Sequence, residues 1–98
     1  METPNDYTIF HEYLQTACEA EMENDHAKAT RLLKKLAWQY AAPGQTSKLQ
    51  AELTDFCSRI IGEVEDDMGW YFLNDNLTGY LKRWQKQGLI YLKKEKWS

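Results

Sequence analysis

The sequence has few of the residues from which metal and cofactor sites are built. It contains two histidines and two cysteines, Cys18 and Cys57, and neither cysteine belongs to a Cys-x-x-Cys pair. A zinc site needs about four convergent ligands, usually in closely spaced pairs. We therefore expect no metal and no other cofactor. We also expect both cysteines to be free, buried thiols in a reducing compartment rather than a disulfide.

Long apolar runs and export signals are also missing. The apolar runs are only about four residues long, as at residues 70–73, whereas a membrane-spanning helix needs about 20. Residues 1–4 lack the basic and apolar regions of a secretory signal. These absences predict a soluble, cytoplasmic protein with no membrane partner.

Motifs for catalysis are equally scarce. The chain has no Gly-x-Ser-x-Gly motif and no Gly-rich phosphate loop. The acidic stretch at residues 63–67 does not follow the ligand spacing of a calcium-binding EF-hand loop. A helical chain of this size rarely encloses a pocket of several hundred Å³. We therefore expect no catalytic residues and no enzymatic activity.

The residues that are present favour one folded domain. The chain has 98 residues, a size typical of a single domain, and 43% of them are hydrophobic. It also carries four Trp, six Tyr and three Phe, which is too aromatic for a disordered chain. We predict one helical domain over residues 1–98 with a modest hydrophobic core.

Charge changes sign in four successive blocks. Residues 1–25, 26–50, 51–75 and 76–98 carry net charges of −7, +5, −6 and +5. Such blocks can cancel inside one chain when acidic helices lie beside basic ones, or they can cancel across a homodimer. They can also present a two-signed surface that docks on a complementary partner. The sequence leaves these alternatives open.

Apolar residues at helical spacing predict four helices. We place them at residues 4–23, 26–42, 48–65 and 76–87, with a tail at 89–98. Asp25 is the expected cap of the second helix, and Ser47 with Gln50 resembles a capping box for the third. Gly88 is the expected left-handed residue after the fourth. The prediction is an all-α bundle of about four helices, with an N-terminal helical hairpin and a short extended basic C-terminal tail.

Two further predictions concern the aromatic and apolar residues near the C-terminus. Residues 70–73 form an aromatic cluster that is either an extended buried segment or a further helical turn. Leu77, Leu81 and Trp84 share one helical stripe and are expected in the core.

The remaining aromatic and basic residues are candidates for contact with a partner. Exposed Trp and Tyr beside Lys and Arg are the residues most often found in interface hot spots. The candidates lie at the end of the second predicted helix, on the fourth and in the tail. They are Trp38, Tyr91, Trp97, Lys82, Arg83, Lys86, Lys93, Lys94 and Lys96.

The same basic residues support a second interpretation. Lys and Arg mixed with aromatic residues are typical of surfaces that follow a nucleic-acid backbone. A helix ending at Gly88, followed by Leu89 and Ile90, resembles the recognition helix and first wing strand of winged-helix regulators. A small DNA-binding transcriptional regulator is therefore the second hypothesis, although the acidic total charge disfavours it.

The chain as a whole resembles the small accessory proteins of temperate phages of enteric bacteria. The resemblance lies in its charge-blocked, aromatic, helical character, as in YTIFHEYL at residues 7–14 and LLKKLAW at residues 32–38. In size and style it is most similar to the phage anti-RecBCD accessory proteins, which bind the host recombination nuclease and alter its handling of DNA ends. The resemblance implies a non-enzymatic modulator of a host RecBCD-type complex in the bacterial cytoplasm. An anti-CRISPR or another anti-defence inhibitor would have the same character.

Overall fold

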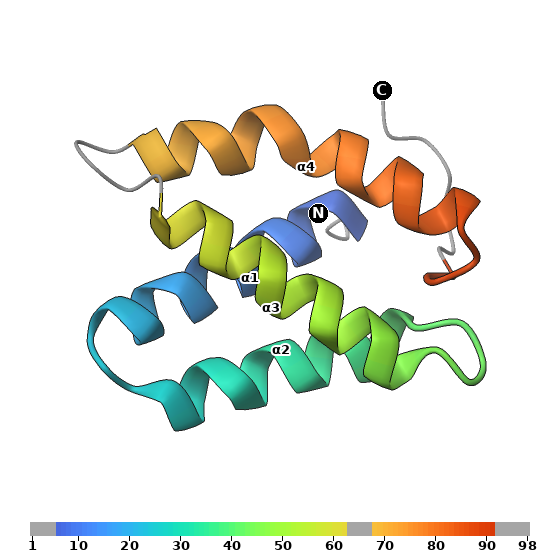
Figure 1. The fold of residues 1–98 in the computed structure, drawn as a ribbon, viewed down its shortest axis with the longest axis horizontal. Helices are drawn as coiled ribbons and strands as arrows, with labels where there is room; N and C mark the ends of the chain where they lie inside the picture. Colours follow the sequence, from blue (N-terminus) through green and yellow to red (C-terminus); the bar gives the residue numbers. More distant parts are fainter. Residues whose placement is uncertain (1–5, 63–67, 92–98) are drawn as a thin grey trace, which may run out of the picture.

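The structure, a computed structural model, describes residues 6–62 and 68–91. These residues form four helices and no strand, which confirms the predicted all-α bundle (Figure 1). None of these helices is both long and apolar enough to cross a bilayer. The helices are α1 (Asp6–Met22), α2 (His26–Tyr40), α3 (Thr46–Gly62) and α4 (Met68–Lys86).

The connection between α1 and α2 reverses the chain within residues 23–25, so these two helices form the predicted N-terminal hairpin (Figure 1). Asn24 adopts a left-handed φ of 65°, which Asn tolerates better than most residues. Asp25 then caps α2, because its side chain accepts a hydrogen bond of 3.1 Å from the backbone N–H of Lys28. The predicted cap is confirmed.

The ends of α2 and α3 differ slightly from the prediction. Helix α2 ends at Tyr40, two residues earlier than expected, because Ala41 adopts an extended conformation. Helix α3 begins at Thr46, so Ser47 lies inside the helix and is not its cap. The backbone N–H of Leu49 instead bonds to the carbonyl of Gln45, at 2.8 Å. The predicted last turn, residues 63–65, lies outside the described residues.

The largest error in the predicted helix boundaries is at the start of α4. The fourth helix was predicted to begin at residue 76, after the turn-like sequence Asn-Asp-Asn at residues 74–76, but it runs without a break from Met68. The side-chain amide of Asn76 donates a hydrogen bond of 2.9 Å to the backbone carbonyl of Phe72, four residues earlier in the same helix. The aromatic residues 70–73 are thus a helical turn: Leu73 is buried in the core, whereas Tyr71 faces solvent.

The core is aromatic where α4 meets α1 and α3. Trp84 is fully buried, as predicted, and its ring lies 6.4 Å from the ring of Phe10 and 6.1 Å from that of Phe56. Its indole N–H donates to a Glu52 carboxylate oxygen at 3.3 Å, so the polar atom of the indole is satisfied. Trp84 therefore joins three helices at one point. Leu77 and Leu81 are also fully buried.

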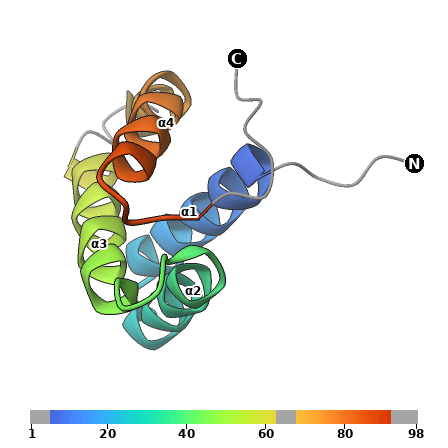
Figure 2. The same cartoon turned by 90° about the vertical axis from the view of Figure 1, so that its right-hand side faces the viewer.

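The segment after α4 closes one end of the bundle. Gly88 has a φ of 76°, and the next N–H, of Leu89, bonds to the carbonyl of Trp84 at 2.9 Å. This is the predicted C-terminal cap. Leu89 and Ile90 are buried, and Ile90 forms an isolated antiparallel bridge with Ala41. Figure 2 shows this segment crossing away from α4.

A buried polar pair ties the start of α1 to the end of α2. The Tyr40 hydroxyl donates a hydrogen bond of 2.9 Å to a carboxylate oxygen of Asp6. Burial, and then this hydrogen bond, raise the pKa of Tyr40 above the ordinary value of 10.0. Because this pKa is higher in the folded than in the unfolded state, the buried, protonated Tyr40 contributes its full stability below pH 10.0, and the contribution decreases as the pH rises from 10.0 toward the raised pKa.

Replacing Tyr40 with phenylalanine tests this pair. At pH 7 the variant is expected to lose about 1 kcal/mol of unfolding free energy, the usual value of one hydrogen bond. The difference from the unmodified protein should shrink as the pH passes 10.0. Urea unfolding followed by circular dichroism between pH 7 and 11 measures this, with Tyr91→Phe as the exposed control. A difference that stays constant with pH would contradict the assignment.

Candidate functional site

Two of the aromatic residues proposed as partner contacts lie on the surface. The side chain of Trp38 is 75% exposed and that of Tyr91 is 71% exposed. By contrast, Phe10, Phe56 and Trp84 are fully buried. An indole ring this accessible carries a large apolar area that nothing in the described part of the chain covers.

The C-terminal segment brings these two residues to the same end of the molecule. The backbone N–H of Tyr91 donates to the carbonyl of Tyr40 at 2.8 Å, and the N–H of Ala42 donates to the carbonyl of Leu89 at 2.8 Å. Trp38 lies two residues before Tyr40, on the last turn of α2. Residues more than 50 positions apart in the sequence therefore share one end of the fold. We call Trp38 and Tyr91 the aromatic end.

Basic side chains of α2 border the aromatic end. Lys34 and Lys35 precede Trp38 by four and three residues, a spacing that makes them its neighbours on the helix surface, and both are exposed. Arg31 continues the same face one turn earlier. These three residues were not among the candidates from the sequence, although the helical spacing from Trp38 would have indicated them.

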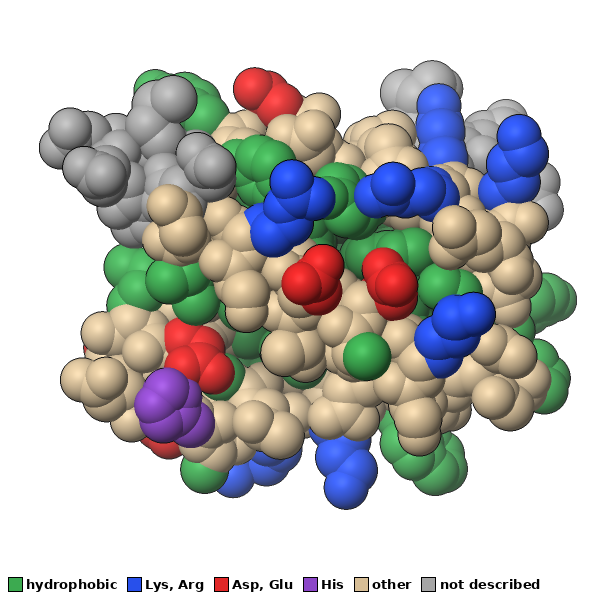
Figure 3. Space-filling model, in the orientation of Figure 1, with side chains coloured by type: hydrophobic (Ala, Val, Ile, Leu, Met, Phe, Trp, Pro, Cys, Tyr) green, Lys and Arg blue, Asp and Glu red, His purple; other side chains and the backbone are tan. Residues whose placement is uncertain are grey.

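A second basic surface follows the C-terminal half of α4. Lys82, Arg83 and Lys86 lie there, and Lys86 ends the helix just before the segment that leads to Tyr91. The Arg83 guanidinium lies over the ring of Tyr80, 4.5 Å from its centroid. Figure 3 shows Lys and Arg side chains over this part of α4 and the adjoining α3, with acidic side chains beside them on α3. We call Lys82, Arg83 and Lys86 the basic face.

These cations are not neutralised by contact ion pairs. The one ion pair between described side chains joins His26 to Glu21, next to the connection between α1 and α2. No Lys or Arg within residues 6–62 and 68–91 lies within 4.0 Å of a described carboxylate. Among the described residues the charge blocks are therefore not joined by contact ion pairs. Neutralisation of acidic helices by basic helices over longer distances stays a prediction.

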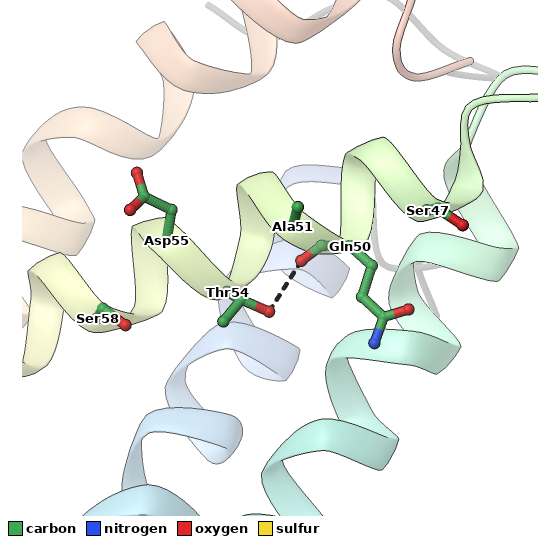
Figure 4. Close-up of a pocket in the computed structure, with 6 residues that line it drawn as sticks. All are labelled: Ser47, Gln50, Ala51, Thr54, Asp55 and Ser58. Atoms are coloured by element: carbon green, nitrogen blue, oxygen red, sulfur yellow. Dashed lines mark hydrogen bonds between the residues drawn. The ribbon is translucent and has the colours of Figure 1, made fainter.

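A polar hollow on α3 offers little chemistry. It has a volume of about 450 Å³, and all six side chains that line it come from the one helix (Figure 4). Thr54 directs its hydroxyl to the carbonyl of Gln50 at 2.9 Å, and Asp55 is the only ionisable residue in the lining. A surface built from one helix does not surround a ligand as an enclosed pocket does.

The remaining proposed contact residues fall beyond the part of the chain that the structure describes. They are Trp97, Lys93, Lys94 and Lys96. Of the proposed set, the structure therefore exposes Trp38 and Tyr91 at the end of the fold where α2 ends, and it carries Lys82, Arg83 and Lys86 on the helix that leads to the Tyr91 segment.

Comparison with family models, with curated proteins and with solved structures found no match to this chain. Within residues 6–62 and 68–91, the structure is a small all-α bundle with Trp38 and Tyr91 exposed and with exposed Lys and Arg side chains that make no contact ion pair to a described carboxylate.

Proposed function

We propose that this protein is a non-enzymatic modulator, of phage origin, that binds a host DNA-processing or defence enzyme and alters its activity. The partner that the sequence resemblance implies is a RecBCD-type nuclease and helicase. The observation that carries the proposal is the aromatic end, where Trp38 and Tyr91 are exposed at the same end of the fold although they are distant in the sequence.

The physical argument rests on what exposed aromatic residues contribute to interfaces. A few large side chains, Trp, Tyr and Arg above all, supply most of the binding energy of a protein interface. Burying an exposed indole and phenol against a partner removes a large apolar area from water at a small cost in side-chain entropy. Trp38 and Tyr91 thus serve as the anchors of the contact.

The basic side chains near the aromatic end also support this end as a docking site. Lys34, Lys35 and Lys86 lie near the aromatic end without contact ion pairs among the described residues. Such cations attract an acidic partner surface and raise the association rate more than the affinity. We therefore propose that the partner presents acidic side chains around a pocket that accepts aromatic rings.

A nuclease assay tests the proposed partner. Purified RecBCD-type enzyme is given linear duplex DNA and increasing amounts of the protein. The expected result is a change in DNA degradation that saturates near a stoichiometric ratio. Unchanged degradation at a large molar excess would exclude this enzyme as the target. Capture of a CRISPR effector or another defence complex from a host lysate would then redirect the proposal to that target.

The basic face favours DNA binding as a second candidate function. Under that hypothesis Lys82→Ala, Arg83→Ala and Lys86→Ala combined should greatly weaken DNA binding. The slope of log K against log salt should also become shallower by about 0.9 for each phosphate that the variant no longer neutralises. Fluorescence anisotropy with labelled duplex DNA at several salt concentrations measures both. Equal affinity and slope for the variant and the unmodified protein would eliminate this function for the basic face.

A further inference from the structure

Two cysteines from different helices meet inside the bundle. The sulfur of Cys18 on α1 lies 3.0 Å from the sulfur of Cys57 on α3, and both side chains are buried. The residues are 39 positions apart in the sequence. A disulfide requires its two sulfurs at about 2.05 Å, so an approach of about 1 Å would bond them.

We propose that Cys18 and Cys57 are a site of oxidative modification, which a peroxide converts into an internal disulfide between α1 and α3. The reduced pair packs as two free thiols in the native core. Oxidation would then join two helices that are not consecutive in the chain. The effect would be a more stable fold rather than a new shape, because the sulfurs are already in contact.

The oxidant has a route to one of the two sulfurs. Cys57 lines a hollow of about 210 Å³ together with Thr54, Ser58 and Ile61 of its own helix, Glu21 of α1 and Leu33 of α2. This hollow has room for hydrogen peroxide, which is little larger than water. Cys18 is fully buried, whereas Cys57 retains 3% exposure. The geometry thus makes Cys57 the sulfur that meets the oxidant first.

The hydrogen bond between the two thiols also favours Cys57 as the sulfur that is oxidised first. The hydrogen bond with the Cys18 thiol lowers the pKa of Cys57 against the opposing effect of burial. The same hydrogen bond, and then burial, raise the pKa of Cys18. The thiolate is the form that reacts with peroxides, so its preferred location is Cys57.

The chemistry balances in two steps. The Cys57 thiolate attacks one oxygen of hydrogen peroxide, which breaks the O–O bond and gives a sulfenic acid and hydroxide. The sulfur of Cys18 then attacks the sulfenic sulfur, forms the S–S bond and loses its proton, and water leaves. Overall, two thiols are oxidised, one peroxide is reduced, and two water molecules are formed. No third His, Cys, Asp or Glu among the described residues joins the pair to make a metal site.

Mass spectrometry of the full chain tests the proposal. Reduced protein is treated with a small excess of hydrogen peroxide in native buffer, the oxidant is removed, and remaining thiols are alkylated in denaturant. The expected product is a monomer that lacks two hydrogen atoms, takes up no alkylating agent and returns to the starting mass with dithiothreitol. Its melting temperature should rise by on the order of 10 °C.

Two variants, Cys18→Ala and Cys57→Ala, are the matched controls. Neither can form the internal bond, so neither should gain thermal stability after the same treatment. The mass result for the unmodified chain decides the question even if one variant fails to fold. Recovery of both thiols in alkylated form, a disulfide that forms only in urea, or a covalent dimer would each overturn the proposal.

Discussion

Replacing Trp38 and Tyr91 together with alanine is expected to abolish measurable partner binding while leaving the fold intact. Truncation of one hot-spot aromatic residue costs about 2 kcal/mol or more, which is roughly a 30-fold weaker complex. The two truncations together should weaken binding by more than about 100-fold if both residues act on one surface. Both side chains are more than two-thirds exposed, so the unfolding free energy should change by less than about 0.5 kcal/mol.

The chain supplies a matched control for this experiment. Tyr71 is 61% exposed, so it resembles Tyr91 in type and accessibility, but it lies in the N-terminal half of α4. Tyr71→Ala should bind the partner as the unmodified protein does. Interferometry with the immobilised host enzyme complex compares the three proteins. Equal affinity for the double variant and for Tyr71→Ala would remove the aromatic end from the interface.

Trp84→Ala is expected to be the most destabilising single substitution in the core. Truncation of a fully buried Trp costs about 3–5 kcal/mol, because it removes apolar packing and leaves a cavity. Small domains have only about 5–15 kcal/mol of stability in total. The variant should therefore unfold at a much lower urea concentration, and a large fraction of it should be unfolded at 37 °C.

Circular dichroism in urea measures this effect without relying on tryptophan fluorescence. Trp84→Phe is a graded test, because it keeps a ring against Phe10 and Phe56 but leaves Glu52 without the indole donor. It should lie between Trp84→Ala and the unmodified protein. Trp38→Ala is the exposed counterpart and should unfold at the normal midpoint. A normal midpoint for Trp84→Ala would mean that Trp84 is not where the three helices are joined.

The fold was predictable where the hydrophobic pattern was long and regular. The stripe that includes Leu49, Leu53 and Phe56 has helical spacing in the sequence and is buried in the structure. The start of α4 was not predictable in this way. Residues 74–76 are Asn-Asp-Asn, a turn signal, yet packing of Leu73 and Leu77 on the core keeps the helix continuous. Tertiary packing here outweighs local preference.

The candidate site was only partly predictable for a different reason. The sequence marked Trp38 and Tyr91 as surplus aromatic residues, but their shared location depends on the bridge between Ala41 and Ile90. One isolated bridge leaves no periodic signal in the sequence. The contact between Cys18 and Cys57 was not predicted for another reason: the packing of α1 against α3 sets which of their residues face each other, and the sequence pattern of each helix does not contain that information.

Capture of the partner from a host lysate is the decisive test of the aromatic end as a docking surface. Tagged protein, its Trp38→Ala/Tyr91→Ala variant and Tyr71→Ala are passed through nuclease-treated lysate of an enteric bacterium, and bound proteins are identified by mass spectrometry. We expect one stoichiometric DNA-processing or defence complex on the unmodified protein and on Tyr71→Ala, and none on the double variant. Columns that stay empty after nuclease treatment, and retain only DNA when the nuclease is omitted, would contradict the proposed function.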